Sequence, residues 1–300
     1  MLLSQDVRRG NFTGSVPGME TTTKVCTLRK RRTYGGLLLL CVLTASSIIV
    51  IHIYLTDVDA LFTSPFTQDD LRSLELTLDA VLNVFNRLNI TFFMTTGTLL
   101  GSYRHHGRIP WDDDIDLMAN SSDKQLIWTS LSALEPDYGL YLHGDDIDSP
   151  YHWKVYPRRH GRPVPFKPFR WPFVDLLFFR ENTTHIWNDS PWFRDECWPR
   201  SAVFPLRLRP FDGFLIPAPC DTQLVLAINF NTTECASPSW IHFHMLPMWS
   251  TTVPCAALAH RYPMVIRRST ADNNGLRQKV AESLMLGNRT LHTFILDNGC

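Results

Sequence analysis

The residues best suited to chemistry in this sequence are four aspartates that lie within five positions: Asp112, Asp113, Asp114 and Asp116. Carboxylates this close repel one another, so the arrangement needs positive charge nearby, and a divalent cation is the natural neutraliser. In the run Asp114-Ile115-Asp116-Leu117 the aspartates alternate with apolar residues. The alternation predicts a β-strand with Asp114 and Asp116 on one face, where both carboxylates can bind one ion.

A glycine turn precedes these aspartates. Residues 91–96 (TFFMTT) favour a short strand, Gly97 and Thr98 end it, and a helical turn is predicted over residues 99–104. Backbone amides at such a helix start suit a phosphate, so Gly97 and Thr98 are candidate phosphate-binding residues. An Asp-x-Asp pair alone is more often a solvated turn than a metal site, and the glycine turn shifts the balance toward the metal.

A further acid, Asp175, lies inside the apolar run at residues 171–179 (WPFVDLLFF), which predicts a buried strand. An unpaired carboxylate there costs on the order of several kcal/mol. Asp175 must therefore bind a metal, be protonated, or pair with a donor such as Arg170 or Arg180.

The motif is similar to the signature of the LicD family, to which fukutin and the fukutin-related protein belong. The similarity rests on residues 97–101 (GTLLG), 104–105 (RH) and 109–116 (IPWDDDID), with Asp175 where the family places a third carboxylate. It implies an α+β fold with the polymerase-β-like core of the nucleotidyltransferase superfamily, a small mixed sheet with packed helices. It also implies transfer of a phospho-alcohol, such as phosphocholine or ribitol phosphate, from a CDP-linked donor to a glycan hydroxyl, with release of CMP.

The resemblance and the residue types together give a set of candidate roles. Asp114, Asp116 and Asp175 are the expected catalytic residues and the ligands of Mg²⁺ or Mn²⁺, which prefer carboxylate oxygens. Asp175 would also help to deprotonate the acceptor hydroxyl. The candidate substrate-binding residues are Gly97, Thr98, Arg104 and His105.

Other residues near the predicted site are expected to support it or to lie on the surface. Asp112 and Asp113 are expected to support the loop, with Trp111 packed beneath them. Lys154, Arg158 and Arg159 could face an anionic donor or form a solvated surface, because charge runs are commonly surface features.

The N-terminal region predicts a membrane anchor. Residues 35–55 contain no Asp, Glu, Lys or Arg, and at ~1.5 Å per residue they match a bilayer core of ~30 Å. Residues 29–32 (RKRR) precede this run, which places residues 1–34 in the cytosol and makes the anchor type II. A cleaved signal peptide is the alternative, although the apolar run is longer than usual for one.

Beyond the anchor we expect a stem at residues 56–68, a LicD-like domain at 69–231 and an extension of unknown role at 232–300. Two amphipathic helices are predicted, at residues 71–88 after a capping box at Thr67–Asp70 and at residues 122–134. Strands are predicted at residues 138–143 and 152–156.

The glycosylation sequons and the cysteines predict that the region after the anchor lies in the lumen of the Golgi or ER. Six Asn-x-Ser/Thr sequons follow the anchor, at Asn89, Asn120, Asn182, Asn188, Asn231 and Asn288. Five of the seven cysteines also follow it and lack C-x-x-C spacing, which predicts one or two disulfides with a thiol left over rather than structural zinc. The formal net charge is zero, so no nucleic-acid partner is expected.

Three functions fit these observations. The first is the membrane-anchored phosphotransferase with a CDP-alcohol donor and a glycan or glycoprotein acceptor. The second is a metal-dependent glycosyltransferase that uses a nucleotide sugar, which requires neither the Gly97 turn nor the Asp175 strand. The third is a non-catalytic relative that binds a glycan or assists a partner.

Overall fold

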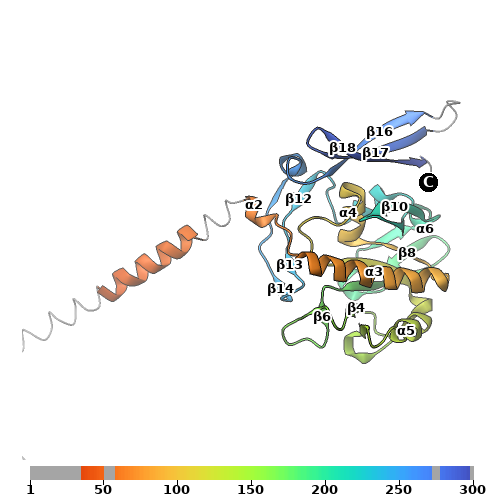
Figure 1. The fold of residues 1–300 in the computed structure, drawn as a ribbon, viewed down its shortest axis with the longest axis horizontal. Coiled ribbons are helices and arrows are strands. Elements are labelled where there is room, and N and C mark those ends of the chain that lie inside the picture. Colours follow the sequence, from red (N-terminus) through yellow and green to blue (C-terminus); the bar gives the residue numbers. More distant parts are fainter. Residues whose placement is uncertain (1–34, 51–57, 272–277, 298–300) are drawn as a thin grey trace, which may run out of the picture. The chain divides into compact units, whose positions relative to one another are not determined.

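The structure is a computed structural model that describes residues 35–50, 58–271 and 278–297. The chain divides into two compact units, residues 1–57 and 58–300. In the first unit residues 35–50 are helical (Figure 1). The rest of the predicted anchor at 51–55 and the predicted tail at 1–34 lie outside the described residues. Within the described ranges, no helix has both the length and the apolar character needed to cross a membrane.

The second unit is built on a mixed sheet, as the α+β prediction requires. The main strand order is β1-β2-β7-β4-β3, and β8 and β9 extend the sheet beside β7. β2 and β7 are parallel, whereas the other pairs are antiparallel. The strands are β1 Phe92–Met94, β2 Ile115–Asn120, β3 Tyr138–Tyr141, β4 Trp153–Pro157, β7 Val174–Glu181, β8 His185–Asn188 and β9 Cys197–Pro199.

The long helix α3, Gln68–Arg87, runs across the sheet and packs on β4 and β7 (Figure 1). Thr67 and Asp70 form the predicted capping box at its start. Its apolar stripe enters the core, where Leu74 and Phe85 are fully buried. The amphipathic pattern therefore predicted both the helix and the face that it buries.

The other predicted elements are present with altered bounds. Helix α4, Thr96–His105, starts earlier than the predicted turn, and α5, Lys124–Ser132, follows the 3-10 turn η1, Ser121–Asp123. The predicted strand at 171–179 is interrupted. The short β6, Arg170–Trp171, pairs with β5, Arg162–Pro163, and β7 begins only at Val174. The proline at position 172 has no N–H to donate to a ladder, which accounts for the break.

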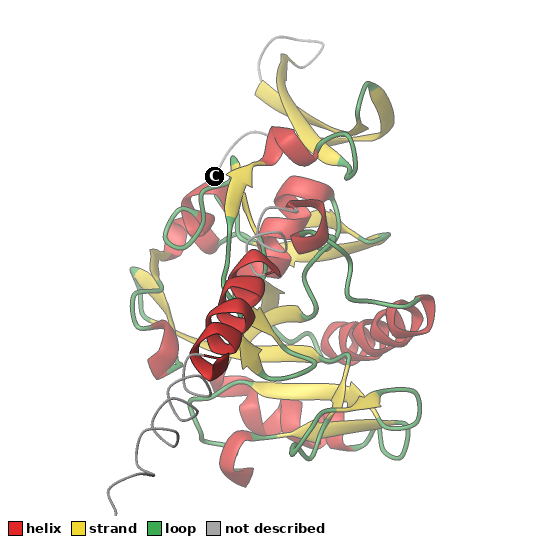
Figure 2. Cartoon of the chain, turned by 90° about the vertical axis from the view of Figure 1, so that its left-hand side faces the viewer, coloured by secondary structure: helices red, strands yellow, loops and turns green. Residues whose placement is uncertain are grey.

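Residues after 200 complete the same unit with short helices and small sheets. Figure 2 shows the unit as a mixture of helices and strands. Two antiparallel pairs, β12 with β15 and β13 with β14, lie before a three-stranded sheet of β16, β17 and β18. The elements are α6 Arg200–Val203, β10 Arg207–Phe211, β11 Phe214–Ala218, α7 Thr222–Leu226, β12 Glu234–Ala236, β13 Trp240–Ile241, β14 Leu246–Pro247, β15 Thr252–Pro254, β16 Met264–Ala271, β17 Gln278–Leu286 and β18 Arg289–Asp297.

Two buried features stabilise this C-terminal part, and the second of them also reaches the residue that follows α4. A disulfide links Cys235 to Cys255, and Cys197 is a free thiol, in agreement with the predicted disulfides and leftover thiol. On β17, the Glu282 carboxylate accepts hydrogen bonds from Arg209 and Arg267 and lies 3.0 Å from Nε2 of His106, which follows α4. The described residues after 231 therefore share the core of the unit.

Candidate active site

The central carboxylates of the site meet where β2 and β7 run side by side. The register of this parallel pair places Asp116 opposite Asp175, while Asp114 immediately precedes β2. One oxygen from each of Asp114, Asp116 and Asp175 lies within 4.8 Å of the others. The structure therefore brings together the three carboxylates that the sequence predicted.

These carboxylates line a cavity of about 830 Å³. The cavity is large enough for a ligand of nucleotide size, since small-molecule sites commonly occupy ~300–1,000 Å³. One side carries aromatic side chains, including Tyr141, Phe169 and Trp192. Polar or charged residues that line it include Thr96, Arg104, Asp112, His143, His152, Lys154, Lys167, Asn231, Glu234, Ser237 and His242.

The Gly97 turn is pressed against the aspartate loop. A Cβ atom at Gly97 would lie 2.5 Å from Oδ2 of Asp112, so any side chain here would force the Asp112 carboxylate to move. The preceding Thr96 has a positive φ of 46°, which is unusual for a β-branched residue, and its hydroxyl donates to Oδ2 of Asp116. The turn thus places a hydroxyl directly on a predicted metal ligand.

Thr98 and Gly97 have different positions in the site. Gly97 lines the cavity, whereas Thr98 is buried and is not among the lining residues. The Thr98 hydroxyl accepts a hydrogen bond of 2.7 Å from the backbone N–H of Asp116. Thr98 therefore fixes the start of the aspartate strand, a contact that the predicted phosphate role did not include.

Arg104 and His105 also differ in their position relative to the cavity. Arg104 lines the cavity, and its Nη1 donates to the carbonyl of Glu234 at 2.9 Å. Burial lowers the pKa of Arg104 to about 10, so the guanidinium remains charged at neutral pH. His105 is buried outside the lining, with Nδ1 2.7 Å from the Pro263 carbonyl. Burial, followed by the charge of Arg104, lowers the pKa of His105 to about 3, so the imidazole is neutral.

The predicted basic group is divided in the structure, because Lys154 lies in the site and Arg158 and Arg159 lie on the surface. Lys154 is buried on β4 opposite Asp175, and its Nζ donates to both oxygens of that carboxylate at 2.7 and 2.8 Å. Arg158 and Arg159 pair with acids on the surface instead. Strand alternation points Lys154 inward, so closeness in sequence was a poor guide. The donor to Asp175 is accordingly Lys154, and neither Arg170 nor Arg180 pairs with it.

Burial and mutual repulsion make the carboxylates hard to ionise. Burial raises the pKa of Asp116 to about 7, and the negative charge of Asp175 adds to the effect. The pKa of Asp112 rises to about 6, mainly through burial. Burial also raises the pKa of Asp114 well above its usual range, although His242 opposes that shift. The positively charged side chains of the site therefore do not fully neutralise its buried carboxylates.

His242 is a site residue that the sequence did not reveal. It follows β13, and its Nε2 lies 3.0 Å from Oδ2 of Asp114. Burial acts to lower the pKa of His242, but the charges of Asp114 and Asp113 outweigh it and raise the pKa to about 10. A single histidine more than a hundred residues from the aspartates has no sequence pattern that could have assigned it.

The expected supporting residues around the loop are in place. Trp111 is buried, and its indole N–H donates to the Ala236 carbonyl at 2.9 Å. Asp113 is buried beneath the site, whereas Asp112 reaches the cavity itself. Asp113 thus has the predicted supporting role, and Asp112 lies nearer the chemistry than expected.

The donor atoms fit a hard divalent cation. Asp114, Asp116 and Asp175 offer carboxylate oxygens, which Mg²⁺ and Mn²⁺ prefer. A carboxylate has about four lone-pair sites, so the two bonds from Lys154 leave Asp175 able to bind an ion as well. The raised pKa values of Asp114 and Asp116 add a reason for a cation to bind, because it would remove their repulsion.

Residues 89–221 match the family model described as "LicD/FKTN/FKRP, nucleotidyltransferase domain". This match identifies a LicD domain within the chain. All the carboxylates of the predicted ion site lie within the LicD domain. His242, Glu234 and Asn231, which line the same cavity, come from the chain that follows it.

Known relatives are similar at low identity. Ribitol 5-phosphate transferase FKRP of Mus musculus is 25% identical over 174 residues, which cover 57% of this chain and 33% of that protein. Ribitol-5-phosphate transferase FKTN of Homo sapiens is 23% identical over 167 residues, covering 54% and 33%. Lipopolysaccharide cholinephosphotransferase LicD of Haemophilus influenzae is 39% identical over 59 residues, covering 18% and 22%. The chain thus spans about a third of the length of the FKRP and FKTN proteins.

Proposed function

We propose that this chain is a metal-dependent phosphotransferase. It would move a phospho-alcohol, of the phosphocholine or ribitol phosphate kind, from a CDP-linked donor to a hydroxyl of a glycan or glycoprotein. The observation that supports this most directly is the meeting of Asp114, Asp116 and Asp175 in one large cavity within a LicD domain. The relatives' names, which specify ribitol-phosphate and choline-phosphate transfer, support the kind of group transferred. We also propose that the sheet and its helices form the polymerase-β-like core of the nucleotidyltransferase superfamily.

The ion in this proposal is Mg²⁺ or Mn²⁺, held by Asp114, Asp116 and Asp175. When bound, it would neutralise charge on the donor's diphosphate and on the group in transfer. Thr96 and Thr98 hold Asp116 through its side chain and backbone. Lys154 orients Asp175 through both carboxylate oxygens. These contacts preorganise the ligands before the donor arrives.

The acceptor hydroxyl would attack the phosphorus distal to the nucleoside. A new P–O bond forms to the acceptor oxygen, the bond to the bridging oxygen of the diphosphate breaks, and CMP leaves. Asp175 is the proposed acceptor of the hydroxyl proton. Arg104, which lines the cavity, is the proposed phosphate clamp, because its planar donors suit phosphate oxygens. Gly97, which also lines the cavity, would let the backbone approach a phosphate. The buried His105 is proposed to orient Arg104, which donates to it from Nε at 3.1 Å.

We further propose that the enzyme works in the secretory pathway. The proposed layout is a cytosolic tail at residues 1–34, a type II signal anchor at 35–55 and a stem at 56–68, with the catalytic unit in the lumen of the Golgi or ER. The Cys235–Cys255 disulfide supports a lumenal unit, since disulfides persist in oxidising compartments. Within that unit, the LicD-like region at 69–231 would supply the carboxylates and residues 232–300 would complete the cavity.

Calorimetric titration of the purified chain tests the reaction class. CDP-choline, CDP-ribitol and UDP-sugars would be added in the presence of Mn²⁺ or of EDTA. We expect Mn²⁺-dependent binding of a CDP-alcohol, lost in Asp116→Asn and retained in Asp79→Asn. Asp79 is a matched control because it is an exposed aspartate on α3. Binding of a UDP-sugar alone would favour a glycosyltransferase, and metal-independent glycan binding without any nucleotide would favour a non-catalytic protein.

A further inference from the structure

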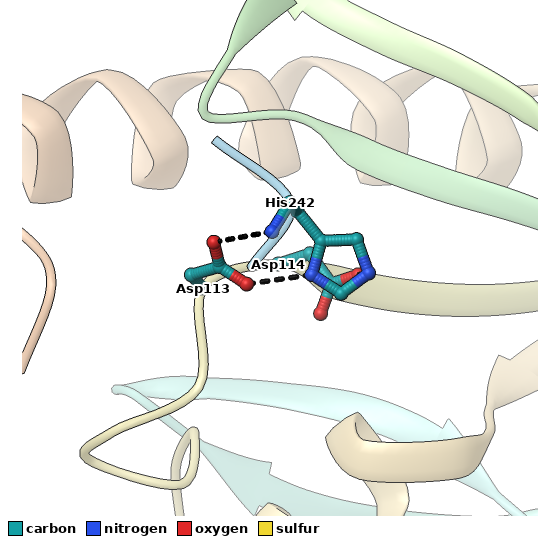
Figure 3. A group of neighbouring side chains, drawn as sticks. All are labelled: Asp113, Asp114 and His242. Atoms are coloured by element: carbon teal, nitrogen blue, oxygen red, sulfur yellow. Dashed lines mark hydrogen bonds and ion pairs between the residues drawn. The ribbon is translucent and has the colours of Figure 1, made fainter. Parts of the chain in front are cut away.

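The imidazole of His242 is held in one orientation by Asp113. Nδ1 of His242 lies 2.6 Å from Oδ1 of Asp113. Oδ2 of the same carboxylate accepts the backbone N–H group of His242 at 2.8 Å (Figure 3). It also accepts the backbone N–H group of Phe243 at 3.2 Å. The Phe173 ring packs edge to face against the imidazole, with centroids 6.0 Å apart. The hairpin loop after β13 is therefore tied to the aspartate loop, and the ring has little freedom to rotate.

The remaining ring nitrogen faces a predicted metal ligand. With Nδ1 engaged by Asp113, Nε2 of His242 lies 3.0 Å from Oδ2 of Asp114. Two adjacent ligands of an octahedral ion with bonds of ~2.1 Å are separated by ~3.0 Å. In the ion-free chain this contact is an ion pair. A cation that displaced the Nε2 proton would find Nε2 and the Asp114 oxygen spaced as neighbouring ligands.

The second carboxylate completes a pattern typical of metal sites. A histidine that binds a metal through one nitrogen usually donates the other N–H to a carboxylate, which fixes its orientation and makes it a better ligand. Asp113 occupies that position here, and Asp113, Asp114 and His242 place their ligand atoms within 4.8 Å of one another. Asp114 belongs both to this group and to the group with Asp116 and Asp175.

We propose that Nε2 of His242 is a direct ligand of a divalent cation shared with Asp114, held in place by Asp113. This inference rests on the proposed function only in placing an ion at the carboxylates. The ion would then be bound by a nitrogen atom as well as by oxygen atoms, instead of by oxygen atoms alone. Mg²⁺ is a harder ion than Mn²⁺ and binds imidazole nitrogen more weakly, so the site is expected to prefer Mn²⁺ over Mg²⁺. One ligand comes from the chain beyond the LicD domain, which gives residues 232–300 a part in ion binding.

Pulsed electron paramagnetic resonance of the Mn²⁺-loaded full chain tests this directly, because a coordinated imidazole gives a nitrogen coupling. We expect the coupling in the wild type and its loss in His242→Ala and in His242→Gln, two variants that differ in side-chain volume. His152→Ala is the matched control. His152 also lines the cavity, but its Nε2 is 4.0 Å from Oδ2 of Asp175, and we expect the coupling to persist there. Circular dichroism would verify that each variant is folded.

Affinity gives a second readout. We expect His242→Ala to weaken Mn²⁺ binding by at least ~10-fold, with a smaller loss for Mg²⁺. Bound Mn²⁺ without nitrogen coupling in the wild type would overturn the inference and leave the phosphotransferase proposal standing. So would coupling that survives in His242→Ala or that disappears only in His152→Ala. Nitrogen-coupled Mn²⁺ in a protein that binds no CDP-alcohol would support the ligand and contradict the proposed function.

Discussion

Asp175 and Lys154 lie directly opposite each other in the antiparallel pair of β7 and β4, and Nζ of Lys154 is 2.7 and 2.8 Å from the two carboxylate oxygens. On the other side of Asp175, β2 places Asp116 at the same level. The three residues form a row across the sheet, with one cation and two carboxylates. Lys154 therefore neutralises part of the negative charge of the two carboxylates, and a bound metal ion would neutralise more of it.

Replacing Lys154 with methionine should strongly destabilise the ion-free protein. Both partners are almost fully buried, with 3% and 6% of their side-chain surfaces exposed. Removing one member of such a pair leaves a buried charge without its partner, and we expect Lys154→Met to lower the free energy of unfolding by about 3–5 kcal/mol. Urea unfolding in EDTA measures the loss.

Two further variants control for this effect. Arg159→Met removes an exposed pair, with Arg159 Nε 3.8 Å from Asp137, and should cost less than about 1 kcal/mol. Adding Asp175→Leu to Lys154→Met should recover part of the stability, because no buried charge then remains unpaired. If Lys154→Met and Arg159→Met were equally mild, the buried pair would not have the importance assigned to it.

Local patterns predicted much of this site. The alternation around Asp114 and Asp116 and the apolar run around Asp175 gave three carboxylates that the structure brings together. Lys154 was assigned to the wrong neighbours, because its pairing with Asp175 depends on which strands adjoin in the sheet. His242 was missed, since its position depends on a contact with Asp113 across 129 residues. Sheet order and long-range contacts of this kind are not encoded in local periodicity.

The same distinction applies to the fold. The capping box and the apolar stripe predicted α3 closely, because helix formation depends on residues three and four apart. The sheet of β16, β17 and β18 was not predicted. Its strands are attached through Glu282, whose partners Arg209 and His106 lie far away in the sequence.

Trp192 should contribute to binding of the donor's base. Its ring lines the cavity, is 56% exposed and packs beside Tyr151 and His152 with centroids 4.6 and 5.3 Å apart. Stacking of a base on an aromatic ring contributes about 1–3 kcal/mol. We expect Trp192→Ala to raise the Kd of a CDP-alcohol roughly 5- to 150-fold and Trp192→Phe to raise it less.

Trp249→Ala provides the matched control for Trp192. Trp249 is 88% exposed and is not among the residues that line the cavity, so its removal should leave the Kd unchanged. Calorimetry of the three variants decides the question. Equal effects at both tryptophans would argue against a stacking role for Trp192.

The sequon at Asn188 should remain without a glycan even when the chain passes through the secretory pathway. Asn188 is 5% exposed, and its Nδ2, the atom that a glycan would modify, donates to Oε2 of Glu196 at 2.7 Å. Asn182, Asn89 and Asn288 are exposed and should accept glycans. Glycopeptide mass spectrometry of protein from a secretory host measures occupancy, and substantial occupancy at Asn188 would contradict the packing described here.

Glu282 should stabilise the fold above pH 5 and lose this effect in acid. Burial alone would raise the pKa of Glu282, but the hydrogen bond with His106 and the charges of Arg209 and Arg267 outweigh it and lower the pKa to about 2. A carboxyl group with a lowered pKa contributes fully above its unfolded-state pKa of ~4.3, and the contribution disappears as the pH falls toward the folded-state value.

Glu282→Gln should accordingly lower the free energy of unfolding by about 3 kcal/mol at pH 7, and the difference from wild type should shrink between pH 5 and pH 2. Thermal and urea unfolding across this range measure the difference. Glu135→Gln is the matched control, because Glu135 pairs with Arg158 on the surface and both side chains are about half exposed. Its effect should be under about 1 kcal/mol and nearly flat with pH. A Glu282→Gln difference that stayed constant down to pH 2 would mean that the charge of Glu282 does not anchor the C-terminal sheet to the residues around α4.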